Sequence, residues 1–306
     1  MKIVFQVSGG IGKSIAATAV CAAIKKQYPQ AELIVISGYP DVFAPNPNVA
    51  MSLDFSNLNY FYPQHIEGRD TKLLLHDPYH DEAFIYQRGH LVENWCNMHG
   101  IDYNGELPEL YLTAKEKSQY GPMFASEKPI MAIQTNGGIS PQGDKYSWPR
   151  DMPIATAQAV VNTFANEYNI VHIRRQDQLG LQYVYPVQAD FRALAVLISM
   201  TSKRLFIDSF AQHTAAALGM PSVVCWIANM PSQFGYEMHT NIMANTPTMR
   251  PEMRHSVFSR YNITGQVTEF PYGSEEDIFN VDEITEAVRA CPQTVVPVAK
   301  DEIILK

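Results

Sequence analysis

The sequence lacks any apolar run that approaches the roughly 20 residues needed to cross a bilayer. It also lacks the succession of basic, apolar and small residues that marks a signal peptide, because an apolar segment at residues 2–7 opens the chain almost at once. These two absences predict a cytoplasmic protein that makes no integral contact with a membrane.

Cysteine is scarce, and its placement excludes the sites that cysteines usually build. The four cysteines, Cys21, Cys96, Cys225 and Cys291, are dispersed without paired spacing. Disulfide frameworks and zinc sites rely on closely spaced cysteines, so we expect free and mostly buried thiols in a reducing compartment. The sequence also contains no Asp-x-Asp motif. It therefore predicts no metal site.

Positive charge is in short supply as well. The chain has 23 lysines and arginines against 31 aspartates and glutamates, which gives a formal net charge of −8. A dedicated nucleic-acid surface needs clustered basic residues, so this balance argues against one, although a local basic groove stays open. Hydrophobic residues make up 46% of the chain and charged residues 18%, which is typical of a folded globular protein.

The segment 205–226 carries the most informative pattern that is present. An apolar run at its start ends at Asp208 and predicts a buried strand. A polar turn leads to the helix formers of residues 213–218, Gly219 supplies a helix stop, and a second apolar run predicts another strand. Such a βαβ unit brings Asp208 and Ser209 to the carboxyl edge of a parallel sheet, where open α/β folds bind ligands. The helix that starts there suits a phosphate.

The alternation of strand, polar turn and helix occurs in both halves of the chain. Residues 2–7 predict a strand that is followed by a glycine-rich turn and a helix, and residues 129–134 predict a strand that restarts the pattern. We therefore expect an α/β protein of two Rossmann-like, doubly wound domains that face each other across a cleft. The domains would span residues 1–126 and 127–306, and the carboxyl-terminal tail could cross back over the first.

Three stretches of the chain resemble signatures of the heptosyltransferase-like family of GT-B glycosyltransferases. They are the turn of Gly9, Gly10, Ile11 and Gly12, then Lys145 with Trp148 and Pro149, and finally Asp208 to Pro221 with His213 and three alanines in register. The stretches also occur in the order and spacing of the family. One departure lies in the third stretch, where Phe210 stands at a position that is usually glycine.

The resemblance implies a GT-B fold and an inverting, metal-independent transfer of a sugar from a nucleotide diphospho-sugar to a hydroxyl acceptor. It implies no cofactor besides the nucleotide sugar. The second domain would hold the donor, and the first would present the acceptor, a glycan rather than modified DNA. The expected donor-site residues are Thr135, Asn136, Lys145, Arg174, Asp208, Ser209 and His213. Thr135 and Asn136 can donate to phosphate oxygens, whereas Arg174 could clamp a diphosphate or pair with Asp177.

The catalytic base has two candidates. In the family an acid follows the second glycine of the first turn, but Lys13 stands there in this chain. A cation cannot take a proton from a hydroxyl unless its pKa is strongly lowered. Asp77 and Asp81 follow a predicted strand, next to His76, and either could take that proton instead. The alternative is that Asp77 only caps a helix that begins at Pro78.

The first glycine turn is open to further interpretations. Together with His76, Gly10 and Gly12 predict an acceptor-side loop in which Lys13 holds a phosphate or an acidic group. The letters GGIGKS also suggest the phosphate loop of a partitioning-type ATPase, although Val7 stands where that motif needs its first glycine. A catalytically inactive protein that binds a sugar nucleotide on the same fold is the third alternative, because Lys13 replaces the family's acid.

Overall fold

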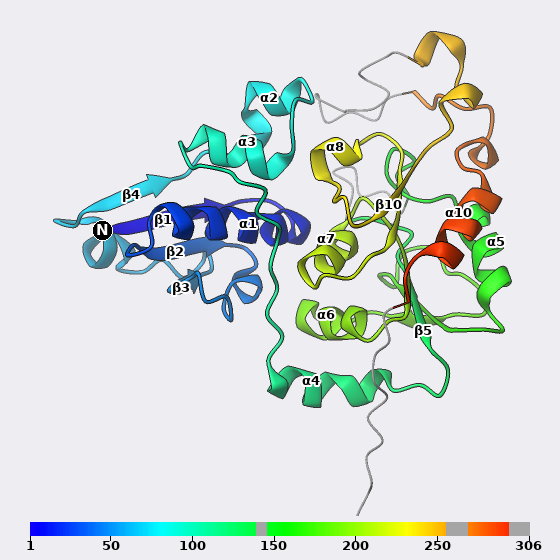
Figure 1. The fold of residues 1–306 in the computed structure, drawn as a ribbon, viewed down its shortest axis with the longest axis horizontal. Coiled ribbons are helices and arrows are strands. Elements are labelled where there is room, and N and C mark those ends of the chain that lie inside the picture. The colour runs from blue at the N-terminus through cyan, green and yellow to red at the C-terminus, as the bar shows by residue number, and fades with distance from the viewer. Residues whose placement is uncertain (139–145, 255–268, 294–306) are drawn as a thin grey trace, which may run out of the picture.

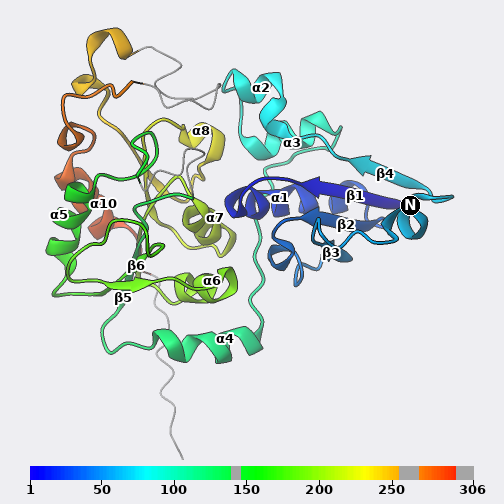
Figure 2. The ribbon, with the colours of Figure 1, turned by 180° about the vertical axis from the view of Figure 1, so that it is seen from behind.

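The protein, seen in a computed structural model that describes residues 1–138, 146–254 and 269–293, contains two separate sheets. All strand pairs within both sheets are parallel. Figure 1 shows the two sheets next to each other, each with its own helices, and Figure 2 shows the same arrangement from behind. The predicted fold class of two α/β domains is confirmed.

The first sheet has the strand order β3-β2-β1-β4. Its strands are β1 (Lys2–Val7), β2 (Glu32–Ser37), β3 (Met51–Leu53) and β4 (Thr71–Leu74). The two central strands are near-continuous apolar runs because both faces of the sheet are covered. Helix α1 (Ile11–Gln27) buries its alanine-rich turns on one face. A smaller cluster around Val4 covers the other face.

Two helices follow β4 and complete the first domain. They are α2 (Glu82–Ile85) and α3 (Leu91–Met98), and α3 packs against α1. The ring of Trp95 in α3 meets Phe5 of β1 edge-on, with ring centroids 5.1 Å apart. This contact extends the core on the α1 side of the sheet.

The second sheet has the order β10-β9-β8-β5-β6-β7, so β8 and β5 lie at its centre. Its strands are β5 (Ile130–Ile133), β6 (Asn169–Ile173), β7 (Tyr185–Val187), β8 (Lys203–Ile207), β9 (Val223–Trp226) and β10 (Thr240–Met243). The predicted strands at the start of this half and around Asp208 are both present. The edge strands β7 and β10 are short and were not anticipated from the sequence.

Helices cover both faces of the second sheet, which makes it the middle of three layers. They are α5 (Ile154–Phe164), α6 (Phe191–Ser199), α7 (Phe210–Ala217), α8 (Pro231–Phe234) and α10 (Val281–Ala290). Side chains of α5 and α10 share one core with one face of the central strands. Side chains of α6 and α7 share another core with the opposite face.

The segment between the two sheets packs on the second domain. Helix α4 (Ala114–Tyr120) lies against α6. The guanidinium of Arg192 in α6 donates to both carboxylate oxygens of Glu116, over 2.5 and 2.9 Å, and to the carbonyl of Tyr111 over 2.5 Å. A domain boundary near residue 127 stays a prediction, and these contacts attach α4 to the second domain.

Short helical turns occupy the remaining connections. They are η1 (Pro40–Val42), the π turn η2 (Tyr62–Ile66), η3 (Pro78–His80), η4 (Gly121–Phe124), η5 (Thr246–Thr248), η6 (Pro251–Met253) and η7 (Glu275–Asp277). All four cysteines are free and buried, as expected. No helix in the described ranges is long and apolar enough to span a bilayer. The tail expected to cross back lies mostly beyond residue 293, outside the described residues.

The two domains meet where α1 packs against α7, which lie next to each other in Figures 1 and 2. A Cβ on Gly12 would lie 2.9 Å from Cδ2 of His213 and 3.5 Å from Cα of Phe210. Side chains of Trp226 and Phe234 in the second domain also join the core of the first. The start of α1 therefore contacts the start of α7 directly. This close approach requires glycine at position 12.

Candidate active site

A partly buried ion pair lies at the end of the first sheet, where β1 and β4 run toward the second domain. Lys13 Nζ donates to Asp77 Oδ1 over 2.5 Å, and Ser8 Oγ donates to Asp77 Oδ2 over 2.6 Å. Burial works to raise the pKa of Asp77, but the hydrogen bonds from Lys13 and Ser8 outweigh it and hold that pKa below its usual range. The carboxylate is therefore ionised at neutral pH.

Lys13 is enclosed by aromatic rings, which decides what it can reach. Its Nζ lies 4.1 Å from the ring centroid of Tyr79 and 5.3 Å from that of Trp95. Its side chain is only 3% exposed, whereas that of Asp77 is 24% exposed. The expectation that Lys13 itself holds a phosphate or an acceptor group does not fit this burial. Lys13 instead holds the carboxylate that solvent can reach, and the same burial argues against a triphosphate on Lys13.

The other two side chains of this loop differ from Asp77. Asp81 caps α2, because its Oδ1 accepts a hydrogen bond from the Ala83 amide over 2.8 Å. His76 is exposed and lies beside His99, with ring centroids 6.0 Å apart. Asp77 also caps a turn, since its Oδ1 accepts from the Tyr79 amide over 3.0 Å. The capping alternative is therefore true of Asp77, in addition to its ion pair.

His213 lies in the interface between the domains. It is 5% exposed, and its Nδ1 is 2.8 Å from the hydroxyl of Tyr236. Burial, with smaller contributions from the rings of His90 and His239, lowers its pKa to about 3. His213 is therefore a neutral residue of the interface, and its contact with a diphosphate stays a prediction.

The loop after β5 uses its polar side chains internally. The hydroxyl of Thr135 donates to Asn136 Oδ1 over 2.8 Å and lies 2.9 Å from His172 Nε2. The side-chain amide of Asn136 donates to Asp151 Oδ2 over 3.1 Å. Both residues are buried. These groups have hydrogen-bond partners inside the protein, and their role as side-chain donors to a phosphate stays a prediction.

Asp151 organises this loop, and the sequence argument missed it. Its carboxylate accepts hydrogen bonds from the amides of Gly137 and Ser147, over 2.8 and 2.9 Å, as well as from Asn136. The guanidinium of Arg150 lies against Gly137, where a Cβ would come within 2.2 Å of it. Glycine is therefore needed for Arg150 to lie over the loop. In the sequence, only the adjacent charges of Arg150 and Asp151 could have pointed to the role of Asp151 in this loop.

Asp208 and Ser209 follow β8 at the carboxyl edge of the second sheet, as predicted. A side-chain oxygen of Asp208 accepts a hydrogen bond from the amide of Asn229. Burial raises the pKa of Asp208, and Asn229 and the nearby Arg150 oppose that rise. Ser209 Oγ accepts a hydrogen bond from Gln134 Nε2 over 3.2 Å. These contacts fix the start of α7 against the loops that follow β5 and β9.

A cavity of about 270 Å3 opens at this edge of the sheet. It is lined by residues after β5, β6 and β7 and by the first residue of α7, among them Gln134, Gly138, Arg174, Arg175, Gln188 and Phe210. Arg175 pairs with Asp177, with Nε and Oδ1 3.0 Å apart. Arg174 Nη1 donates to three loop carbonyls, those of residues 175, 176 and 178. Two cationic side chains therefore border the cavity.

The predicted donor residues are thus only partly brought together. Asn136 and Arg174 both line the cavity, and Thr135 lies next to Asn136. Asp208 and Ser209 lie beside the cavity, where Ser209 bonds to Gln134 of its lining, whereas His213 lies in the domain interface. Lys145 lies outside the described residues. Within the described ranges, no three histidine, cysteine, aspartate or glutamate side chains are grouped so that they could hold a metal ion.

Comparison with known proteins gives matches in structure only. No family model matches the sequence, and no curated protein matches it either. The structure of the glycosyl transferase family 9 protein from Veillonella parvula DSM 2008 is similar, with a TM-score of 0.67 and 12% identity, over 94% of this chain and 96% of that one.

Two further structures are similar at comparable identity. E. coli ADP-heptose lps heptosyltransferase II has a TM-score of 0.60 and 15% identity, over 79% of this chain and 90% of that one. The dodecameric iron-containing heptosyltransferase TibC, from enterotoxigenic E. coli H10407, has a TM-score of 0.62 and 13% identity, over 94% of this chain and 76% of that one. This chain therefore has the two-domain GT-B fold that the sequence predicted.

Proposed function

We propose that this protein is a glycosyltransferase that moves a sugar from a nucleotide diphospho-sugar to a hydroxyl acceptor, with inversion and without a metal ion. The observation that carries the proposal is the cavity of about 270 Å3 at the carboxyl edge of the second sheet. Open α/β sheets bind ligands at this edge, and the cavity is bordered by Phe210, whose backbone adjoins the start of α1.

The donor would bind in this cavity of the second domain. Similar structures have been solved with ADP and with ADP-D-beta-D-heptose, which supports a nucleoside diphosphate as the carrier of the sugar. Arg174 at the cavity and Arg150 beside Asp208 are the cations that would stabilise the departing diphosphate, together with Lys145. Asp208 and Ser209 would line the donor at the start of α7. These cations are the reason to expect transfer without a metal ion.

Asp77 is the proposed base. An acceptor hydroxyl attacks the anomeric carbon, a new carbon–oxygen bond forms, and the bond to the diphosphate breaks with its electron pair on the leaving phosphate oxygen. The hydroxyl proton passes to a carboxylate oxygen of Asp77. Oδ1 already accepts from Lys13 and from the Tyr79 amide, whereas Oδ2 accepts, among the described residues, from Ser8 alone. Oδ2 is therefore the oxygen that would accept the proton.

Asp81 is the weaker candidate, because its carboxylate caps α2. The glycine turn and His76 are the proposed acceptor side, and a glycan is the proposed acceptor, since one similar structure is an lps heptosyltransferase. Lys13 orients Asp77 and is a positioning residue. The ion pair supplies a fixed carboxylate near the place where the family has its acid, which is why transfer is favoured over an inactive binding protein.

Nucleotide binding and turnover test the proposal separately. A panel of ADP-, UDP-, GDP- and dTDP-sugars is screened by thermal shift, because binding to the folded state raises the melting temperature. Each ligand that binds is then incubated with glycan acceptors and EDTA, and the released nucleoside diphosphate is measured. Release in EDTA that requires the acceptor supports sugar transfer without a metal ion. Binding without release favours the inactive protein, and no shift with any sugar nucleotide contradicts the donor site.

A further inference from the structure

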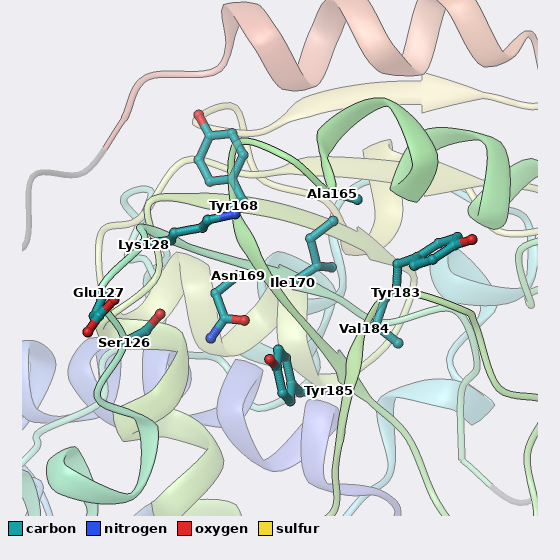
Figure 3. Close-up of a pocket in the computed structure, with 10 residues that line it drawn as sticks. All are labelled: Ser126, Glu127, Lys128, Ala165, Tyr168, Asn169, Ile170, Tyr183, Val184 and Tyr185. Carbon is teal, nitrogen blue, oxygen red and sulfur yellow. The ribbon is translucent and has the colours of Figure 1, made fainter.

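A second and larger cavity, of about 480 Å3, lies at the opposite edge of the second sheet. Figure 3 shows the ten residues that line it. They come from three short stretches, residues 126–128, 165–170 and 183–185, which precede or begin strands β5, β6 and β7. The cavity is therefore at the amino ends of these strands. It shares no lining residue with the cavity at the carboxyl ends.

Aromatic side chains border this cavity and remain accessible. Tyr183 is 74% exposed and Tyr185 is 63% exposed. Tyr183 also has a φ of 59°, in the left-handed region that a bulky side chain rarely adopts. Such a conformation costs on the order of 1–3 kcal/mol and tends to occur where a site demands it. Here the residue with this conformation is Tyr183, whose aromatic ring is exposed to solvent.

The remaining wall is fixed by hydrogen bonds. The hydroxyl of Tyr168 accepts a hydrogen bond from Gln293 Nε2 over 2.7 Å, and Lys128 Nζ donates to the carbonyl of Asn166 over 3.2 Å. In Figure 3 the side chain of Asn169 lies between those of Ser126 and Tyr185. The cavity thus presents the amide of Asn169 and the hydroxyl of Ser126 next to the ring of Tyr185. Hydrogen bonds to other parts of the protein already hold Tyr168 and Lys128 in its wall.

The charge of the lining selects a class of ligand. Glu127 supplies one carboxylate and Lys128 one ammonium, so the formal charges of the lining cancel. A phosphate-bearing ligand would need a surplus of donors or cations, which this wall does not offer. A neutral saccharide has C–H faces that pack on a tyrosine ring and a rim of hydroxyls that bond to amides, carboxylates and hydroxyls. The volume is within the range of about 300–1,000 Å3 for small-molecule sites.

We propose that this cavity binds neutral saccharide, with Tyr185 as the ring on which a sugar unit packs and with Asn169 and Glu127 as its hydrogen-bonding partners. The site is separate from the proposed donor site and goes beyond the proposed transfer reaction. On a transferase whose acceptor is a glycan, a second site that binds the same glycan raises the local concentration of acceptor.

Direct binding tests the proposal without any transfer assay. The full chain is titrated with maltohexaose, cellohexaose and N-acetylchitohexaose, and saturation-transfer-difference NMR gives the affinity of each. We expect at least one of the three to bind, and Tyr185→Ala to weaken that binding by about tenfold, the loss expected for one packed aromatic ring. Tyr185→Phe keeps the ring and should keep most of the affinity. Asn169→Ala should weaken binding without removing the ring.

The control is Tyr62→Ala, because Tyr62 is 62% exposed and lies on the first domain, away from the cavity. It should bind as the parent does. Thermal unfolding of each variant checks that the fold is retained. If none of the three oligosaccharides binds, or if Tyr185→Ala binds as tightly as Tyr62→Ala, the proposal is wrong. Nucleotide-sugar binding by the same samples is scored separately, so a failure of the donor site is distinguishable from a failure here.

Discussion

Lys13 and Asp77, 64 residues apart in the chain, form a 2.5 Å ion pair at the point where the first domain meets the second. The pair has a geometric origin in the sheet. β1 and β4 are parallel with Phe5 opposite Leu74, so the next positions beyond the strands place Ser8 opposite Asp77. The first turn of α1 then delivers Lys13 to the other carboxylate oxygen. A carboxylate therefore stands close to the position that an acid after the second glycine would occupy.

Replacing the carboxylate of Asp77 tests its role as the base. We expect Asp77→Asn to lower the rate of sugar transfer by about 10²–10⁴-fold, the usual contribution of a positioned general base. Nucleotide-sugar affinity, measured by calorimetry, should change little because the proposed donor site is on the other domain. Asp81→Asn is the matched control, and it should keep both transfer and stability, because asparagine caps a helix about as well as aspartate does. Equal rates for Asp77→Asn and the parent would remove Asp77 as the base.

Removing the ammonium of Lys13 should move the pH profile. Lys13 helps to hold the pKa of Asp77 down, whereas burial acts to raise it. In Lys13→Met the pKa of Asp77 therefore rises, and the carboxylate protonates at a higher pH than in the parent. We expect the acid limb of kcat/KM to shift to higher pH, because that limb reports the ionisation of the base in the free enzyme. A profile that falls uniformly without a shift would show that Lys13 does not act through Asp77.

The ion pair that attaches α4 to α6 should make stability depend on acid. The hydrogen bonds from Arg192 lower the pKa of Glu116 to about 2, and burial opposes this shift only in part. A carboxyl whose folded pKa is depressed contributes stability above its unfolded pKa of about 4.3, and the contribution is lost as pH falls toward 2. In urea unfolding, Glu116→Gln should be less stable than the parent at pH 7 and should approach the parent near pH 2. A constant difference between pH 7 and pH 2 would contradict this assignment.

Arg150 offers a test of the donor side. It lies over Gly137 and close enough to Asp208 to influence its pKa, at the edge of the sheet where the diphosphate is proposed to bind. Arg150→Ala should raise the Kd for the sugar nucleotide by about tenfold or more, since a charge-assisted hydrogen bond contributes roughly 1.5–3 kcal/mol. Arg88→Ala removes an equal charge from an exposed side chain on the first domain and should leave Kd unchanged. Identical Kd values for the two variants would exclude Arg150 from the donor site.

Much of the fold could be predicted because its strands are buried on both faces. The runs that became β1, β2, β5 and β8 are apolar and end in glycine or in polar residues. Such runs do not depend on distant partners to be recognised. The short edge strands β7 and β10 escaped prediction because Tyr185, Pro186 and Thr240 carry little of that pattern. Their strand conformation depends on pairing with β6 and β9.

The site was harder to predict because partners of buried polar groups come from distant segments. Thr135 and Asn136 have the right chemistry for phosphate, but His172 and Asp151 take up their hydrogen bonds. Nothing local in the sequence announces those partners. The same holds for Lys13, whose type suggested a phosphate contact. Its pairing with Asp77 depends on the register of β1 with β4, which composition and periodicity do not fix.

Gly12 is the most direct test of how the two domains are joined. A Cβ there would lie 2.9 Å from Cδ2 of His213, closer than real Cβ atoms approach a neighbour, and 3.5 Å from Cα of Phe210. His213 is buried and hydrogen-bonded to Tyr236, so its side chain has little room to move away from an added Cβ. Gly12→Ala must therefore separate the starts of α1 and α7, at an expected cost of about 1–3 kcal/mol in urea unfolding.

Gly10→Ala is the matched control for Gly12→Ala, two residues earlier on the same turn. Gly10 has a φ of −81°, and a Cβ built there meets nothing within 4 Å. Gly10 is the N-cap of α1, where alanine caps less well than glycine, and this small loss opposes the gain from a less flexible unfolded chain. The control should therefore unfold at about the same urea concentration as the parent. Because the proposed base and the proposed donor cavity lie on different domains, Gly12→Ala should also slow transfer more than it weakens nucleotide binding. If both alanine variants match the parent in stability and transfer, the contact between α1 and α7 does not position the two halves of the site.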